Sequence, residues 1–304
     1  LCAKERDAVG RVTVRVPATS ANLGPGFDSF GCALALYNTY TFETISGGLE
    51  IFGCPEEFRN RDNLSVVAYR YAMEALGLPM EPLRLDIDAQ IPVCRGLGSS
   101  SAMIIGGMMA ANALHGSPLS KEEMLRLCTV VEGHPDNLAP ALYGGMTASL
   151  MREGRPVTAR FHLSEKLRFL ALVPDFPLST QLARSVLPQR VPFADAVFNV
   201  SHAALLLRAL ETADTEMIAL ALDDRLHQPY RWGLIEGIDL AEKTAKECGV
   251  TAFCISGAGS TCLCIADNDA VGECLKERLP QVLPNWQVLS LRLDTEGAKL
   301  LESM

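Results

Sequence analysis

The residues best suited to carry chemistry form a short loop of glycine and serine. Residues 92–102 read Pro-Val-Cys-Arg-Gly-Leu-Gly-Ser-Ser-Ser-Ala, between a strand-like run and a long apolar run. Glycine lets the backbone approach an anion closely, and the N-terminus of a following helix offers free N–H groups and a favourable dipole. We therefore expect the loop to bind phosphate, although an ordinary strand-to-helix turn capped by serine has a similar composition. No lysine follows the second glycine and the third glycine of G-x-G-x-x-G is missing, which excludes a Walker loop and a dinucleotide loop.

Acidic and amide side chains follow on a second loop, residues 132–137, which reads Glu-Gly-His-Pro-Asp-Asn. Phosphoryl transfer requires a cation at the β- and γ-phosphates, and Mg²⁺ is held by only a few protein oxygens. Glu132 is the natural protein ligand, since the end of a predicted helix is a slightly unfavourable place for a purely structural carboxylate. Asp136 is a candidate general base for a reacting hydroxyl. The alternatives are a solvated helix-end acid at 132 and a structural acid at 136.

Two further segments end in an arginine. Residues 179–184 read Ser-Thr-Gln-Leu-Ala-Arg, and residues 224–231 read Asp-Arg-Leu-His-Gln-Pro-Tyr-Arg. Arginine recognises a carboxylate through charge-assisted hydrogen bonds, whereas Asp or Asn recognises an ammonium group. Taken alone, each arginine is more often a surface charge.

The loop at residues 92–102 carries in full the motif P-x-x-x-G-L-G-S-S-[ASG]-A, and in this the chain resembles the GHMP kinase family. That family also has an N-terminal motif and a C-terminal glycine-rich motif. Residues 17–28, Pro-Ala-Thr-Ser-Ala-Asn-Leu-Gly-Pro-Gly-Phe-Asp, resemble the first, and residues 255–260, Ile-Ser-Gly-Ala-Gly-Ser, resemble the last. The first motif and the string at 132–141 have the form found in the members that phosphorylate L-homoserine. The resemblance therefore implies ATP-dependent phosphorylation of the side-chain hydroxyl of L-homoserine, a step of threonine biosynthesis.

The resemblance also implies a set of site residues. Those expected at ATP are Pro92, Arg95, Gly96, Leu97, Gly98, Ser99, Ser100, Ser101, Asn63, Gly257 and Gly259. Asn63 would read the purine edge, or else cap a helix. Mg²⁺ is expected on Ser100 and Glu132. Those expected at the homoserine substrate are Asn22, Asp28, His134, Asn137, Thr180, Arg184 and Arg231.

Each of these residues is given a role by the resemblance. Arg184 and Arg231 are expected to take the substrate carboxylate, and Asn22 and Asp28 its ammonium group. Asn137 is expected to touch the reacting hydroxyl, while His134 either orients the substrate or packs in its loop. The expected catalytic residues are Asn137, Asp136, Glu132 and Ser100. In these kinases no carboxylate is firmly assigned as base, so either Asp136 accepts the proton or positioning and electrostatic stabilisation do most of the work.

The chain is expected to fold as two domains and to belong to the α+β class. Residues 1–165, which carry the phosphate loop, are expected to form the N-terminal GHMP kinase domain, an α/β domain like the second domain of ribosomal protein S5. In residues 166–304 the predicted elements follow the order β-α-β-β-α-β, apart from extra helices, which indicates a ferredoxin-like α+β domain. Near the start, a predicted strand over residues 11–16 ends at Pro17, and a loop over residues 18–30 follows.

Composition limits the partners and the compartment. The 27 basic and 36 acidic residues give a net charge of −9 without a basic cluster, so nucleic acid and anionic membranes are not expected partners. The most apolar stretch, residues 102–114, is shorter than the roughly 20 residues of a membrane span. Residues 4–7 are charged, so the N-terminus lacks the apolar core of a signal peptide, and a cytoplasmic protein is expected. The ten cysteines are scattered in apolar settings, which favours reduced thiols over disulfides or zinc.

Two other interpretations remain at this point. The first is a GHMP kinase that acts on mevalonate, a diphosphocytidyl sugar alcohol or a sugar, none of which has an ammonium group beside a carboxylate. The second is a catalytically silent ligand sensor of the same fold, although intact Ser100, Glu132 and Asn137 argue against it. The resemblance further implies that the protein is a homodimer.

Overall fold

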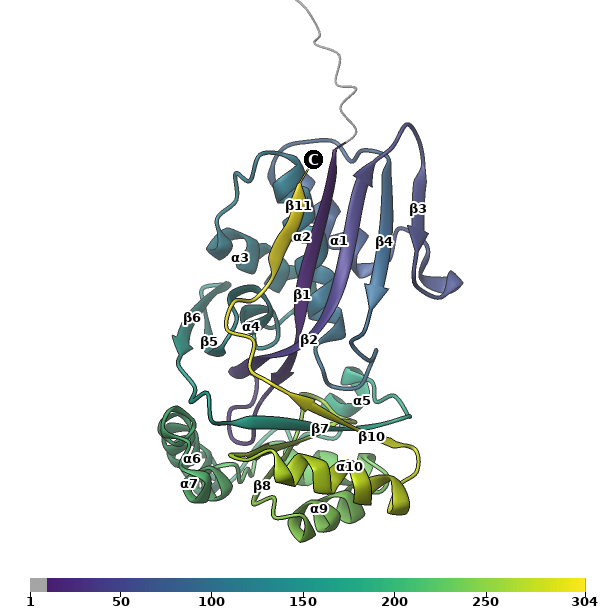
Figure 1. Cartoon of the computed structure of the whole chain (residues 1–304). Helices are drawn as coiled ribbons and strands as arrows, with labels where there is room; N and C mark the ends of the chain where they lie inside the picture. The colour runs from purple at the N-terminus through teal and green to yellow at the C-terminus, as the bar shows by residue number, and fades with distance from the viewer. Residues whose placement is uncertain (1–9, 304) are drawn as a thin grey trace, which may run out of the picture.

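Two sheets organise the molecule (Figure 1). The structure is a computed structural model that describes residues 10–303. The expectation about a signal peptide rests on residues 4–7 and lies outside the described residues.

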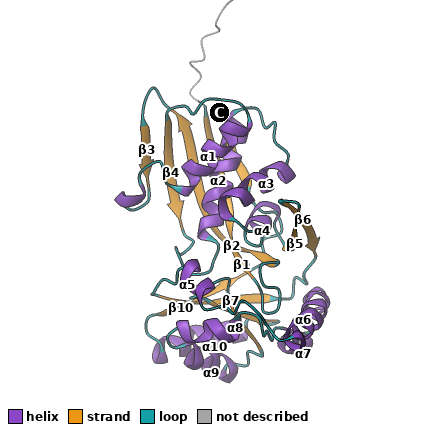
Figure 2. Ribbon diagram, turned by 180° about the vertical axis from the view of Figure 1, so that it is seen from behind, coloured by secondary structure: helices purple, strands orange, loops and turns teal. Residues whose placement is uncertain are grey.

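The first sheet has seven strands, in the order β11-β1-β2-β4-β3, with β5 and β6 added beside β2. The strands are β1 (Arg11–Ala21), β2 (Phe30–Thr44), β3 (Leu49–Phe52), β4 (Leu83–Ala89), β5 (Met146–Arg152), β6 (Arg155–Phe161) and β11 (Lys299–Ser303). Helices cover the face of this sheet that is turned to the viewer in Figure 2. They are α1 (Leu64–Ala75), α2 (Ser99–Leu114), α3 (Lys121–Glu132) and α4 (Leu138–Tyr143), with the 3-10 turn η1 (Glu56–Phe58) before them.

The second sheet has four antiparallel strands in the order β10-β7-β9-β8. They are β7 (Arg168–Pro174), β8 (Ala252–Ile255), β9 (Cys262–Ala266) and β10 (Trp286–Leu291). Two helices pack beside them, α9 (Ile238–Glu247) and α10 (Ala270–Val282). This is the ferredoxin-like order predicted from the sequence. The extra elements between β7 and α9 are α5 (Thr180–Ser185), α6 (Phe193–Thr212), α7 (Thr215–Ala221), α8 (Gln228–Arg231) and the 3-10 turn η2 (Trp232–Leu234).

Close packing of α2 fixes the phosphate loop. The helix begins at that loop and is almost wholly buried. A Cβ atom at Gly107 would stand 1.9 Å from the carbonyl oxygen of Ser65 on α1, and one at Gly106 would stand 2.6 Å from the ring of Tyr40 on β2. Only glycine permits these approaches, and the N-terminus of α2 is thereby held rigidly against the sheet.

The start of the chain differs from the sequence prediction. β1 continues past Pro17 to Ala21, so the prediction that this strand ends at Pro17 is wrong. Proline has no N–H to donate, and here it lies at a bulge, because the pairing with β2 shifts register between Pro17 and Ala18 and then resumes. The loop between β1 and β2 is therefore residues 22–29, shorter than the predicted 18–30.

The last described strand also departs from the expected division of the chain. β11 pairs antiparallel with β1, so residues 299–303 complete the first sheet, although residues 166–304 were expected to form the second domain. The division near residue 165 otherwise stays a prediction. Since the chain crosses from one sheet to the other before β7 and again after β10, two covalent connections join the two halves.

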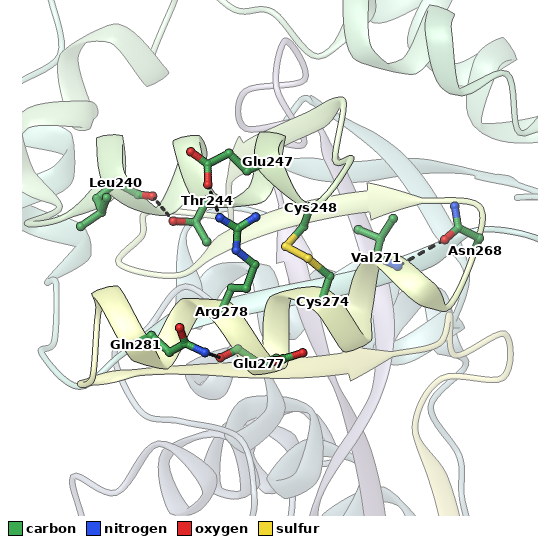
Figure 3. The surroundings of a disulfide bond; sticks show 10 residues. All are labelled: Leu240, Thr244, Glu247, Cys248, Asn268, Val271, Cys274, Glu277, Arg278 and Gln281. Atoms are coloured by element: carbon green, nitrogen blue, oxygen red, sulfur yellow. Dashed lines mark hydrogen bonds and ion pairs between the residues drawn. A yellow bond between two sulfur atoms is a disulfide. The ribbon is translucent and has the colours of Figure 1, made fainter.

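The expectation of reduced cysteines is wrong for one pair. Cys248, at the end of α9, and Cys274, on α10, form a disulfide with a Cα–Cα distance of 5.7 Å (Figure 3). The two helices lie side by side on the second sheet and bring together thiols that are 26 residues apart. The other cysteines in residues 10–303 are free, and burial raises the pKa of the Cys32 thiol to about 12, which keeps it protonated.

Within residues 10–303, one helix is long and apolar enough to cross a membrane by length and composition alone. This is α6, Phe193–Thr212, and 22% of its apolar 18-residue window is buried. The expectation of no membrane span stays a prediction. Three exposed apolar residues of α6, Phe193, Val197 and Val200, recur at helical spacing and are called the α6 stripe.

Candidate active site

A cavity of about 150 Å³ lies where the loops of both halves meet, and it holds most of the predicted site residues. All the residues expected at the substrate line it, namely Asn22, Asp28, His134, Asn137, Thr180, Arg184 and Arg231. The expected catalytic residues Asp136, Glu132 and Ser100 line it as well. Its size suits a small metabolite, because drug-sized ligands need roughly 300 Å³ or more. A larger hollow, about 560 Å³ beside residues 160–167 and 292–295, contains none of the predicted site residues.

The phosphate loop lies between the two other motifs. Gly96 and Gly98 have φ angles of 76° and 69°, in the left-handed region that favours glycine. A Cβ atom would stand 2.2 Å from the Ser256 carbonyl oxygen at Gly96 and 1.9 Å from Thr19 Oγ1 at Gly98. Ser256 Oγ donates a hydrogen bond of 2.6 Å to the Gly96 carbonyl oxygen. The three motifs, far apart in sequence, therefore form one packed cradle at the N-terminus of α2.

Some residues expected at ATP do not face the cavity. They are Pro92, Arg95, Leu97, Ser101 and Asn63, whereas Gly96, Gly98, Ser99, Ser100, Gly257 and Gly259 line it. Arg95 donates to the carbonyl oxygens of Val93, at 2.9 Å, and Pro174, at 3.1 Å, so it ties the phosphate loop to β7.

Asn63 caps a helix, which was the alternative to a contact with the purine edge. It caps α1 by accepting from Ser65 N at 3.1 Å, and it donates to the Phe58 carbonyl oxygen at 3.0 Å. Both ends of its amide are therefore in use. Its contact with adenine stays a prediction.

The two expected Mg²⁺ ligands lie side by side. Ser100 Oγ donates to Glu132 Oε1 at 2.7 Å, and Ser101 Oγ is 3.2 Å from the same oxygen. No group of three or more His, Cys, Asp or Glu side chains suited to a metal lies within residues 10–303. A hydroxyl and a carboxylate oxygen next to a phosphate loop nevertheless fit Mg²⁺, which usually keeps several waters and binds substrate phosphates as well as one or two carboxylates.

Asn137 is oriented by a residue that sequence reasoning missed. Thr19 Oγ1 donates to Asn137 Oδ1 at 2.7 Å. Because the amide oxygen accepts this bond, the amide N–H₂ is the end available to a ligand in the cavity. The first motif contains Thr19, but threonine in a strand has no signal that distinguishes this role from packing.

Asp136 and His134 form a pair beside Asn137. Asp136 is 2% exposed, and its Oδ1 lies 2.6 Å from His134 Nδ1 and 2.9 Å from the Asn137 backbone N–H, which donates to it. The hydrogen bond to Asp136 raises the pKa of His134. A carboxylate used in this way orients its loop and stabilises a protonated imidazole.

Opposite charges face one another across the other side of the cavity. Arg184 makes a bidentate ion pair with Asp28, at 2.6 and 3.0 Å. Arg231 is 2% exposed and donates from Nε to the Ala183 carbonyl oxygen and from Nη1 to the Gly257 carbonyl oxygen. Within residues 10–303 it makes no ion pair with a carboxylate, and burial, followed by repulsion from Arg184, lowers the pKa of its guanidinium to about 10. The group is still charged at neutral pH, so the cavity contains a buried cation that favours an anionic ligand.

Comparison with known proteins identifies the family. A family model described as GHMP kinases N terminal domain matches residues 63–145, and one described as GHMP kinases C terminal matches residues 205–285. A homoserine kinase of Clostridium botulinum (strain Eklund 17B / Type B) is 41% identical over 96% of this chain and 99% of its own length. One from Clostridium beijerinckii is 42% identical over the same shares.

Solved structures agree. A putative homoserine kinase from Listeria monocytogenes superposes with a TM-score of 0.81 at 31% identity, over 96% of this chain and 99% of that one. A homoserine kinase from Cytophaga hutchinsonii gives a TM-score of 0.85 at 24% identity, over 99% and 100%, which shows the shared fold. The chain therefore belongs to the GHMP kinases and, among them, to the homoserine kinase family. It is accordingly a phosphotransferase that acts on an alcohol group.

The bond from Thr19 to Asn137 should matter for turnover. Thr19→Val keeps the shape of the side chain but releases the Asn137 amide, so kcat should fall about tenfold, the scale of one net hydrogen bond, while KM for ATP stays within about twofold. Steady-state kinetics measures both. Thr13→Val on the same strand, which breaks a 3.1 Å bond to Thr41, is the matched control. Equal turnover of the two variants would contradict this role.

The His134–Asp136 pair should give the fold a defined pH dependence. Because the pKa of His134 is raised in the folded state, the pair stabilises the protein fully below the unfolded pKa, and this contribution is lost as pH rises through the folded pKa. His134→Gln should therefore lower the urea midpoint more at about pH 5.5 than at about pH 9. In an Asp136→Asn background the same substitution should lose this trend. A larger effect at the alkaline pH would have the wrong sign for this pair.

Proposed function

We propose that the chain catalyses transfer of the γ-phosphoryl group of ATP to the side-chain hydroxyl of L-homoserine, giving O-phospho-L-homoserine for threonine biosynthesis. One observation carries the choice of substrate. A metabolite-sized cavity beside the phosphate loop contains a carboxylate, Asp28, and two guanidinium groups, Arg184 and Arg231. The homoserine kinases that match nearly the whole chain support the same substrate.

When the substrate binds, Asp28 and Arg184 exchange their contact with each other for contacts with the charged groups of the substrate. The Asp28–Arg184 pair neutralises itself in the absence of a ligand, and each side chain is 37% exposed. A zwitterionic amino acid offers an ammonium group to Asp28 and a carboxylate to Arg184 and Arg231, so both charges keep a partner when it enters. Asn22 supports this arrangement from the side, since its Oδ1 accepts from the Asp28 backbone N–H at 3.0 Å. Thr180 lines the same cavity and completes the expected substrate set.

Catalysis rests on positioning and electrostatic stabilisation. The free N–H₂ of Asn137 is suited to hold the reacting oxygen, while the phosphate loop and the N-terminus of α2 hold the transferred group. Mg²⁺, held by Ser100 and Glu132 together with the phosphates, would neutralise charge on the β- and γ-phosphates. Asp136 orients His134 and the loop rather than serving as base. In a loose transition state the hydroxyl proton leaves late, to an oxygen of the transferred phosphoryl group, so no strong base is needed.

Composition supports a cytoplasmic location, and the exposed face of α6 supports a dimer. An acidic chain with a net charge of −9 suits a cytoplasmic protein that binds neither nucleic acid nor membrane. The stripe on α6 instead suits a second copy of the chain, because its exposed apolar residues recur at helical spacing. They are Phe193, 85% exposed, Val197, 52%, and Val200, 72%.

The substrate assignment makes a direct prediction. Protein with Mg-ATP should phosphorylate L-homoserine, and analogues without the carboxylate, 2-amino-1,4-butanediol, or without the ammonium group, 4-hydroxybutyrate, should be poorer by at least about tenfold in kcat/KM. Coupled ADP release measures this. Arg231→Met should remove most of the preference for the carboxylate, whereas Arg225→Met, on the same segment but paired with Asp195, should not. Better turnover of mevalonate or galactose would refute the proposal.

The dimer has its own test. Val200→Glu places a charge in the α6 stripe and should convert the protein from dimer to monomer in light scattering, since a buried unpaired charge is costly. Val157→Glu, on β6 and 52% exposed, should leave the mass unchanged. A wild-type protein that is monomeric at micromolar concentration would rule out this interface.

A further inference from the structure

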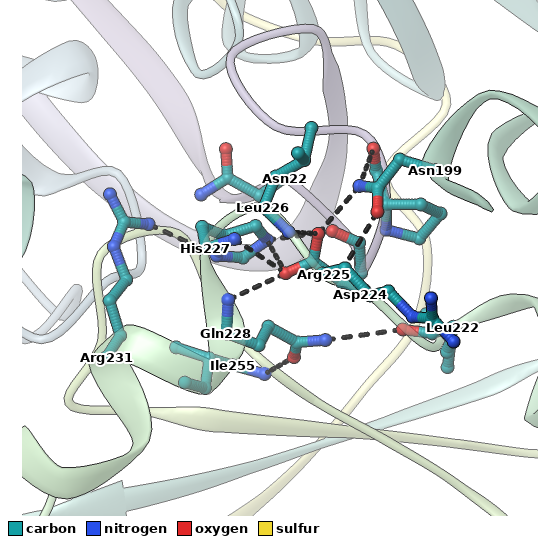
Figure 4. A network of polar contacts seen from close by, with 12 residues as sticks. Asn22, Asn199, Leu222, Asp224, Arg225, Leu226, His227, Gln228, Arg231 and Ile255 are labelled. Atoms are coloured by element: carbon teal, nitrogen blue, oxygen red, sulfur yellow. Dashed lines mark hydrogen bonds and ion pairs between the residues drawn. The ribbon is translucent and has the colours of Figure 1, made fainter. Parts of the chain in front are cut away.

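A group of buried polar side chains lies beside Arg231 (Figure 4). Its centre is Asp224, whose side chain is fully buried. Asp224 Oδ1 accepts from Asn199 Nδ2 at 2.7 Å and from the Leu226 backbone N–H at 2.9 Å. Its Oδ2 accepts from the backbone N–H groups of His227 and Gln228, at 2.9 and 2.6 Å. Four hydrogen bonds satisfy this carboxylate and fix the start of α8, the short helix that carries Arg231.

His227 connects this centre to the substrate cavity. Its Nε2 lies 2.8 Å from the Gly24 carbonyl oxygen, which can only accept, so Nε2 carries the proton. The lone pair is then on Nδ1, which faces Arg231 Nη1 at 3.4 Å. The imidazole is wholly buried and stacks on Phe27 with the ring centres 5.2 Å apart. The charged groups that face it are Asp224, Arg231 and Asp28.

Both recognition elements of the cavity therefore depend on one imidazole. Gly24 lies in the loop at residues 22–29 that carries Asp28, so the Nε2 bond holds the carboxylate side. The Nδ1 contact holds the guanidinium side. The loop at residues 22–29 and Arg231 are also linked through Gly257. Its carbonyl oxygen accepts from both Asn22 Nδ2, at 2.8 Å, and Arg231 Nη1, at 3.1 Å.

We propose that His227, fixed by Asp224, is a positioning residue that sets the separation between Asp28 and Arg231, and so selects substrates with an ammonium group and a carboxylate on one carbon. This inference rests on the proposed function, because it takes Asp28 and Arg231 as the ligands of these two groups. His227 does not touch the substrate. It acts on substrate affinity and selectivity, while the phosphate loop, Glu132 and Asn137 perform the transfer.

The test compares His227→Leu with wild type at saturating and limiting substrate. KM for L-homoserine should rise about tenfold, as expected when a bond to a charged group is lost, while kcat and KM for ATP change by less than about threefold. The preference for homoserine over 2-amino-1,4-butanediol, which lacks the carboxylate, should fall by a similar factor. His227→Gln, whose amide N–H reaches the Gly24 carbonyl oxygen, should restore most of the affinity. His202→Leu, which removes a histidine stacked on Phe198 of α6, is the matched control and should resemble wild type.

The outcomes separate the two proposals. If wild type phosphorylates homoserine and His227→Leu keeps its KM and selectivity, the positioning role is wrong and the proposed function stands. A parallel rise in KM for ATP and homoserine would also overturn it, because that is the signature of general damage to the fold. If His227→Leu does not fold, His227→Gln is compared with His227→Asn, because the Asn side chain is too short to reach the Gly24 carbonyl oxygen. Equal KM values for homoserine in these two variants would also overturn the positioning role. A wild-type chain without activity on homoserine would overturn both proposals.

Discussion

The close approach of three backbone segments around two glycines is the constraint on which the site depends. Gly96 and Gly98 have no room for a side chain, since Ser256 and Thr19 occupy the space where a Cβ atom would lie. The same contact that excludes a side chain brings Thr19 next to Asn137 and brings the third motif against the phosphate loop. The cradle is therefore a product of tertiary packing, and the two sheets must be correctly placed before any of its donors can point at a phosphate.

The charged residues Asp28, Arg184 and Arg231 of the cavity differ in how their charges are balanced. Asp28 and Arg184 form an ion pair, so neither charge in the cavity is isolated. Arg231 is different, because its direct contacts within residues 10–303 are carbonyl oxygens, the His227 ring and the Phe27 ring, 5.1 Å from its guanidinium. Asp28, Asp224 and Asp136 act on its charge only at longer range. Under the proposed function, the substrate carboxylate would be the first anion in direct contact with this guanidinium.

Features that depend on a few consecutive residues could be predicted from the sequence. The phosphate loop follows from residue type and spacing, and the homoserine kinase family is confirmed. The resemblance to the GHMP kinases implied that Ser100 acts with Glu132 and that Asp28, Arg184 and Arg231 lie in one site, and these residues do line one cavity. The missed features come from contacts between distant segments. Thr19 and His227 carry no local signal, and the pairing of Cys248 with Cys274 depends on how α9 and α10 pack. Pro17 misled the strand assignment because a bulge tolerates a residue without an N–H.

The return of β11 to the first sheet has a consequence for synthesis on the ribosome. β1 and β2 can pair early, but the other edge of β1 waits for residues 299–303, which follow the entire second sheet. At roughly 5–20 residues per second, that edge stays open for tens of seconds in a nascent chain. Open edges invite pairing with other chains, and charged residues on them reduce this risk. Arg15 lies opposite Lys299 of β11, and Arg11 immediately precedes the paired residues of β1. Both charges are therefore placed to protect this edge until β11 has been synthesised.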